Sequence, residues 1–193
     1  MRRKSASLSS IAILSAVLFT SATLHAYPAP TLAQRMVEIN FMRGMIDHHQ
    51  MAINNAQLCV SKAFHQDLKT MCKSIISTQM QEINVMQSWL SDWYGISHSP
   101  EIDNADQKMT QMLSSLDGAA FERQFLKMMT SHHWQAIIRA SEFLEEGNHH
   151  SLEDLAEVIV KGQAKEIGTM QQWLCNWYGI CDWHDHGDFR GNE

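Results

Sequence analysis

Two short segments of the chain concentrate side chains that bind soft and borderline metal ions. The sequence holds 13 Met and 11 His among 193 residues, and in both segments methionines precede a pair of adjacent histidines. The residues are Met42, Met45, His48 and His49 in the first segment, and Met128, Met129, His132 and His133 in the second. Imidazole suits copper, zinc, iron and nickel, whereas a thioether adds a preference for Cu(I). The combination predicts copper as the bound metal, with Cu(I) preferred and Cu(II) also accepted.

A carboxylate and a further methionine follow each histidine pair. These residues are Glu82 and Met86 after the first pair, and Glu166 and Met170 after the second. At 100° per residue they share a helix face with apolar residues. A carboxylate on such a face is costly unless it is paired or bound to a metal, so all four residues are candidate ligands. The alternative is a buried polar network, in which both carboxylates accept hydrogen bonds from the histidines and Gln79 and Gln163 orient the network.

These elements belong to an internal repeat with an offset of 84 residues. Residues 38–96 and 122–180 share 22 identities without a gap, so each histidine pair and each following carboxylate has a counterpart. Glu38 and Glu122 are also equivalent, and each falls on the same helical stripe as its histidine pair. The chemistry is therefore predicted to occur twice.

Each copy of the repeat has the apolar spacing of a helical hairpin. Two such hairpins in tandem predict an all-α, ferritin-like four-helix bundle. We expect helices over about 32–62 and 67–94, a short helix over 107–116, and a third long helix over 117–147. Ser151 with Asp154 predicts a capping box for the last long helix. Gly95 and Gly179 are expected to end the second and fourth long helices.

The two ends of the chain differ from the repeat. Residues 1–26 combine a basic start with an apolar run and are predicted to be a signal peptide, which leaves the bundle over 27–183. Residues 184–193 form a tail in which His184 and His186 stand among aspartates. This tail predicts a weak site for a divalent metal, or else a solvated acidic segment. Export would place the protein in the periplasm or outside the cell, with no stable membrane insertion after signal removal.

The four cysteines suit an oxidising compartment, where disulfides persist. Cys59 and Cys72 are equally far from the turn of the first hairpin, so they lie level with each other and predict a bridge. Cys175 and Cys181 flank the end of the last helix and predict a local bridge. The alternative is four buried or metal-bound thiols.

Composition excludes several other classes of function. The formal net charge is −6 and no basic stripe occurs, which argues against nucleic acid as a partner. Only 9 Gly and 3 Pro are present, which disfavours a turn-rich β fold, and no glycine-rich phosphate loop is found.

The twice-repeated segment with paired histidines, followed by the pattern QxxEIxxMxxWL, resembles an exported ferritin-like family long known only as a domain of unknown function. The resemblance covers residues 38–180. It implies a four-helix bundle that binds copper and supports copper resistance, without implying catalysis. The family's Met and His positions correspond to two sets of residues: Met42, Met45, His48 and His49 in the first repeat, and Met129, His132 and His133 in the second. Leu126 stands where the first repeat has Met42.

The first reading is therefore a periplasmic copper-binding protein that sequesters, buffers or carries copper through Met and His ligands. Copper ions are its expected partners, and a copper efflux or sensor protein is a candidate protein partner. One alternative is a ferritin-like metal-dependent oxidase, but Val85 and Thr169 stand where a Glu-x-x-His motif would need histidine. The other alternative is a helical adaptor whose metal binding is incidental. We expect no enzymatic activity.

Overall fold

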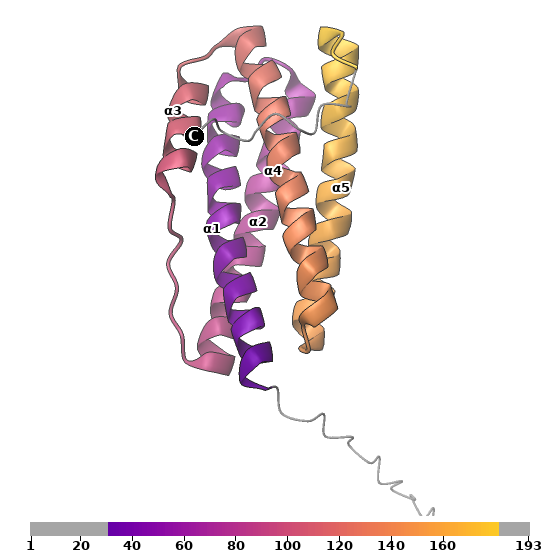
Figure 1. Cartoon of the computed structure of the whole chain (residues 1–193). Helices are drawn as coiled ribbons and strands as arrows, with labels where there is room; N and C mark the ends of the chain where they lie inside the picture. Colours follow the sequence, from indigo (N-terminus) through magenta and orange to yellow (C-terminus); the bar gives the residue numbers. More distant parts are fainter. Residues whose placement is uncertain (1–30, 182–193) are drawn as a thin grey trace, which may run out of the picture.

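The computed structural model describes residues 31–181 and is shown in Figure 1. Its elements are α1 (Leu32–Lys62), α2 (Gln66–Tyr94), α3 (Asn104–Ser114), α4 (Gly118–Glu146) and α5 (His150–Tyr178). The four long helices form a bundle in which α1 packs on α2, α4 packs on α5, and α1 joins the two hairpins through α4 (Figure 1). The predicted all-α bundle of two hairpins is confirmed. The expected signal peptide and the tail with His184 and His186 lie outside the described residues.

Local sequence explains several of the helix ends. Thr31 opens α1 with a capping box, because its side chain accepts from the backbone N–H of Gln34 and the Gln34 side chain accepts in return. Gly95 and Gly179 close α2 and α5 with φ of 66° and 69°, in the left-handed region that glycine adopts without a Cβ penalty. Both predicted stops are confirmed.

Two helix starts differ from the prediction. The capping box at Ser151 is wrong, because α5 already begins at His150 and Ser151 lies inside its first turn. The turn before it is held by a tertiary bond, from the Asn148 backbone N–H to Glu38. The short helix α3 starts earlier than expected because Asp103 caps it, accepting from the backbone N–H of Asp106.

The core consists of two apolar clusters with a polar layer between them. The Met86 cluster contains Met42, Met45, Met86, Leu90 and Phe143, among others. The Met170 cluster contains Met51, Phe125, Met128, Met129 and Met170, among others. Along each long helix the buried histidines, Gln79, Glu82 and Gln163 fall between the residues of the two clusters, apart from Ile53, whereas Glu38 and Glu122 lie outside this layer. The candidate ligands therefore meet near the middle of the bundle.

Both predicted disulfides are present. Cys59–Cys72 ties the end of α1 to the start of α2, with 6.2 Å between the Cα atoms. Cys175–Cys181 ties the end of α5 to the segment that follows, with 4.4 Å between the Cα atoms. Among residues 31–181 no helix is both long and apolar enough to span a membrane.

Candidate metal centre

Four buried histidines from α1 and α4 form the middle of the polar layer. The rings of His48 and His132 stack on each other, with centroids 3.6 Å apart and an angle of 25° between the planes. His49 and His133 flank this pair, and in each repeat the two neighbouring rings are 6.2 Å apart at 54°. The duplicated sequence thus folds into two equivalent halves that meet at the His48–His132 pair.

The outer histidines pair with the predicted carboxylates of α2 and α5. His49 Nε2 lies 2.8 Å from Glu82 Oε2, and His133 Nε2 lies 2.7 Å from Glu166 Oε2. The contact of His133 is a hydrogen bond, whereas His49 Nε2 lies within ion-pair distance of Glu82 without hydrogen-bond geometry. Because an ionised carboxylate only accepts, Glu166 places the ring proton of His133 on Nε2 and leaves the lone pair on Nδ1. The Nδ1 atoms of His49 and His133 are buried and have no hydrogen-bond partner. An imidazole whose second nitrogen is held by a carboxylate is the usual arrangement of a metal-ligating histidine.

Buried thioethers stand next to each of these imidazoles. Met45 precedes His49 by four residues on α1, and Met129 precedes His133 by four residues on α4, so each pair shares a helix face. Met42 and Met86 belong to the same apolar cluster as Met45, whereas Met128 and Met170 belong to the cluster of Met129. The structure therefore divides the predicted methionine ligands into two sets, one on each side of the polar layer.

Carboxylates and histidines do not form a metal site by themselves. Among residues 31–181 no group of three or more His, Cys, Asp or Glu side chains is arranged to hold a metal ion. Glu82 and Glu166 instead serve as partners of imidazoles, in the way that the polar-network alternative predicts.

The central pair carries no charge at neutral pH. Burial lowers the pKa of His48 and of His132 well below the usual 6.5, and the neighbouring imidazoles and the guanidinium of Arg139 lower both values further. Neither ring nitrogen of His48 makes a hydrogen bond in normal geometry, nor does Nδ1 of His132. Neutral imidazole is the form that binds metal, so these rings are already in the state that a ligand needs.

A cavity of about 420 Å³ connects the central pair to the surface. Its lining includes His48, His132, Arg139 and, at the start of α3, Asp103 and Asp106. The linker after α2 forms one wall, because Asp47 of α1 binds the His98 ring and the backbone N–H of Glu101. The sequence did not predict this opening to the surface, because Asp103 and Asp106 belong to the segment between the repeats and have no repeat counterpart.

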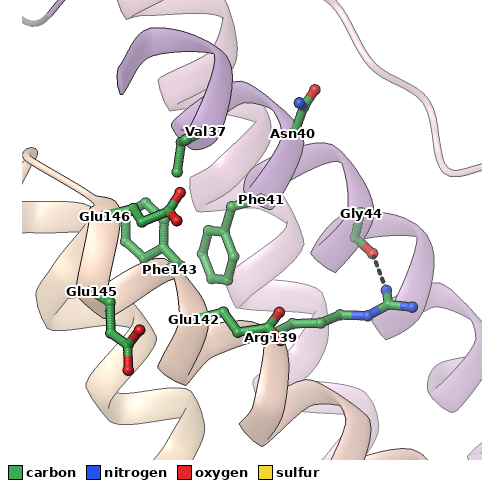
Figure 2. A pocket seen from close by; sticks show the side chains of 9 residues that line it. All are labelled: Val37, Asn40, Phe41, Gly44, Arg139, Glu142, Phe143, Glu145 and Glu146. Atoms are coloured by element: carbon green, nitrogen blue, oxygen red, sulfur yellow. Dashed lines mark hydrogen bonds between the residues drawn. The ribbon is translucent and has the colours of Figure 1, made fainter. Parts of the chain in front are cut away.

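A second cavity, of about 620 Å³, lies on the other side of Arg139 (Figure 2). Phe41 and Phe143 stack in its wall at 4.3 Å, while Glu142, Glu145 and Glu146 stand around its edge. It holds none of the predicted ligands, so it is separate from the polar layer.

Glu38 and Glu122 lie at the ends of the bundle, away from the histidine pairs whose stripes they share. Glu122 accepts from the backbone N–H groups of Phe64 and His65, from His65 Nδ1 and from the Tyr178 hydroxyl. Glu38 accepts from the Tyr94 hydroxyl and from the turn before α5. Each carboxylate therefore holds the turn of the other hairpin.

The histidines of these turns have structural partners. His65 stacks on Trp177 at 3.8 Å, and His149 stacks on Trp93 at 3.6 Å. The half-buried tryptophans thus close the ends of the bundle beside the two hairpin turns.

The family profile of Domain of unknown function (DUF305) matches residues 38–174, which is most of the chain. The protein belongs to this family. No functionally curated protein matches it significantly. The matched range runs from within α1 to within α5 and includes every predicted ligand except the tail histidines.

Solved structures of the DUF305 fold support the assignment. Cu(I)-bound CopM is 31% identical with a TM-score of 0.66, and the match covers 74% of this chain and 98% of CopM. Cu(II)-bound CopM is 29% identical with a TM-score of 0.67, covering 73% and 97%. A DUF305 protein from Streptomyces coelicolor, considered a secreted protein, is 25% identical with a TM-score of 0.64, covering 72% and 91%. CopM has also been seen with silver bound.

Proposed function

We propose that this DUF305 protein is an exported copper-binding protein. It sequesters, buffers or carries copper, Cu(I) in preference to Cu(II), and so supports copper resistance. The observation that carries the proposal is the pair of buried imidazoles, His49 and His133, each with a carboxylate oxygen close to Nε2 and with Nδ1 open. The similarity to CopM, which binds Cu(I), Cu(II) and silver, supports the same choice of metal.

The donor set favours Cu(I). The open Nδ1 of His49 stands one helical turn from Met45, and the cluster beside it adds the sulfur atoms of Met42 and Met86. In the second repeat Met129 and Met170 accompany His133. A site with more thioether than imidazole is soft, and soft sites select Cu(I) over Zn(II). Glu82 and Glu166 act through the imidazoles, by fixing their orientation and raising their basicity.

Binding, and not catalysis, is the proposed activity. A diiron oxidase would need a Glu-x-x-His motif, and the third residues after Glu82 and Glu166 are Val85 and Thr169. A copper efflux or sensor protein is the proposed recipient of the metal.

A Cu(I) titration against a chromophoric chelator tests the proposal. Met45→Leu/His49→Gln should remove one tight Cu(I) equivalent, because it removes a thioether and an imidazole. The fold should survive, because leucine is close to methionine in volume and glutamine can still hydrogen-bond to Glu82. The matched control is Met36→Leu/Met80→Leu, which changes exposed methionines of the same hairpin and should leave binding unchanged. Excess Zn(II) should fail to displace Cu(I). Unchanged Cu(I) stoichiometry in the first variant, with its helical circular dichroism intact, would refute the assignment.

A further inference from the structure

The two repeats place different side chains beside the central His48–His132 pair. Met51 follows His48 by three residues on α1, and Met128 precedes His132 by four residues on α4. At an offset of 84 residues, their counterparts are Gln135 and Gly44. One side of the central pair therefore carries two thioethers and the equivalent side carries none.

The packing of α1 on α4 brings the two thioethers to the same level. The helices run antiparallel, because Phe41 stacks on Phe143 and His48 stacks on His132, so the α4 number falls as the α1 number rises. Met51 is thus level with the turn that holds Met128. Both side chains are nearly buried, at 4% and 5% exposure, and both belong to the Met170 cluster.

Unpaired polar atoms surround this position. His48 has no hydrogen bond in normal geometry at either nitrogen, and Nδ1 of His132 has none. Asn55 donates to the Met51 carbonyl and to Met51 Sδ, both at 3.1 Å, while its own Oδ1 is buried without a partner. The bond from Asn55 fixes the Met51 thioether and leaves one sulfur lone pair available. Buried polar atoms without partners are rare in proteins and point to a missing ligand.

The equivalent side is built differently. There Gly44, Gln135 and Arg139 line the 420 Å³ cavity, and Arg139 occupies the position of Asn55. Arg139 Nη1 lies 3.4 Å from the Gly44 carbonyl oxygen, in the space that a longer residue 44 would enter. Its positive charge opposes a cation on that side, whereas the Met51 side of the described structure has neutral Asn55 instead.

We propose that Met51 and Met128, together with His48 and His132, form a further site for a soft monovalent cation, Cu(I) or Ag(I). The site rests on the proposed copper-binding function and adds Met51 as a ligand. It lies on the seam between the two repeats and occurs once, because only one side of the seam has thioethers.

Ag(I) titration of protein labelled with ¹³C in its methionine methyl groups tests this site. The methyl signals of Met51 and Met128 should shift together within the first equivalents, and the ring ¹⁵N signals of His48 and His132 should shift with them. Met51→Leu/Met128→Leu should bind one Ag(I) fewer than the wild-type chain. The matched control Met36→Leu/Met80→Leu should bind the wild-type number.

The outcomes separate this site from the proposed function. If Met51 and Met128 stay silent while Met45 and Met129 respond, the seam site is wrong and copper binding by the repeats stands. If no methionine responds and no Ag(I) binds, both the seam site and the proposed function are wrong. The wild-type spectra decide the question even if the double variant fails to fold.

Discussion

Replacing Glu122 by glutamine should destabilise the protein more than the equivalent change at Glu38. Glu122 accepts two backbone N–H bonds of 2.7 and 2.9 Å, a bond from His65 Nδ1 at 2.6 Å and a bond from the Tyr178 hydroxyl. Glu38 accepts from the Tyr94 hydroxyl and, at 3.3 Å, from the Asn148 N–H. The two positions are equivalent in the repeat, so each serves as the control for the other.

The magnitude follows from the number of charge-assisted bonds. A hydrogen bond to a charged group is worth roughly 1 kcal/mol more than a neutral one, and a neutral side chain costs less to bury. We expect Glu122→Gln to lower the free energy of unfolding by about 2–3 kcal/mol, and Glu38→Gln by about 1 kcal/mol. At roughly 2–4 °C per kcal/mol for a domain of this size, the melting temperature should fall by about 4–12 °C and 2–4 °C respectively.

The pH dependence of the Glu122 effect has a defined sign. Burial acts to raise the pKa of Glu122, but the bonds from Tyr178, His65 and Phe64 outweigh it and hold the pKa below the usual 4.5. A carboxylate with a depressed pKa stabilises the fold above its unfolded pKa and loses that contribution as pH falls through the folded value. The difference between wild type and Glu122→Gln should therefore shrink as the pH drops below 4.5.

Urea unfolding of the metal-free proteins, followed by circular dichroism, measures both effects. A Glu38→Gln variant that is destabilised as much as Glu122→Gln would contradict the bond count. A wild-type advantage over Glu122→Gln that stays constant down to the lowest accessible pH would contradict the linkage. Cu(I) stoichiometry should be unchanged in both variants, because neither residue lies in the polar layer; its loss would make these glutamates ligands.

Three other measurements probe the centre and the first hairpin. The pKa values of His48 and His132 are lowered in the folded protein, so these rings take up protons in the unfolded chain first as the pH falls. Below pH 6.5 the free energy of unfolding of the metal-free protein should therefore fall by up to about 1.4 kcal/mol per pH unit for each ring. A urea midpoint that stays constant from pH 7 to 5 would contradict this. Arg139→Gln should raise the pKa values of His48 and His132 in an NMR titration, whereas Arg139→Lys keeps the positive charge and should leave both pKa values unchanged. Identical titrations of the wild type and both variants would exclude the guanidinium as a cause. Cys59→Ser/Cys72→Ser should lower the free energy of unfolding by about 3 kcal/mol in urea, as the chain-entropy estimate for this loop gives; an unchanged value would show that the bridge adds nothing.

The repeat made most of the fold predictable. An offset of 84 residues fixes two equivalent hairpins, and equal distances from the first turn place Cys59 beside Cys72. Both follow from counting along one chain. The pairing of His49 with Glu82 was foreseen only as an alternative, because a helical wheel shows that two faces can meet but not which atoms do.

Position along the helix axis could not be read from the wheel. Glu38 shares a stripe with His49 but lies three turns away, where it reaches Tyr94 and the opposite turn. The stacking of His48 on His132 depends on how α1 crosses α4, which no local pattern encodes. The entrance was invisible for the same reason, since Asp103 and Asp106 approach the layer only through the path of the linker.

Duplication and divergence act on different parts of this molecule. A single hairpin would leave its polar layer exposed, and its Glu38 or Glu122 would have no second turn to hold, so the two copies depend on each other. Several identical residues pair across or within the repeats, such as His48 with His132. The residues that differ, such as Met51 and Gln135, lie around that pair and alter its surroundings on one side. The bundle formed by the two repeats can therefore be symmetric while the metal-binding side chains beside the His48–His132 pair are not. The fold depends on the shared residues, and the residues beside that pair can differ between the repeats without disrupting it.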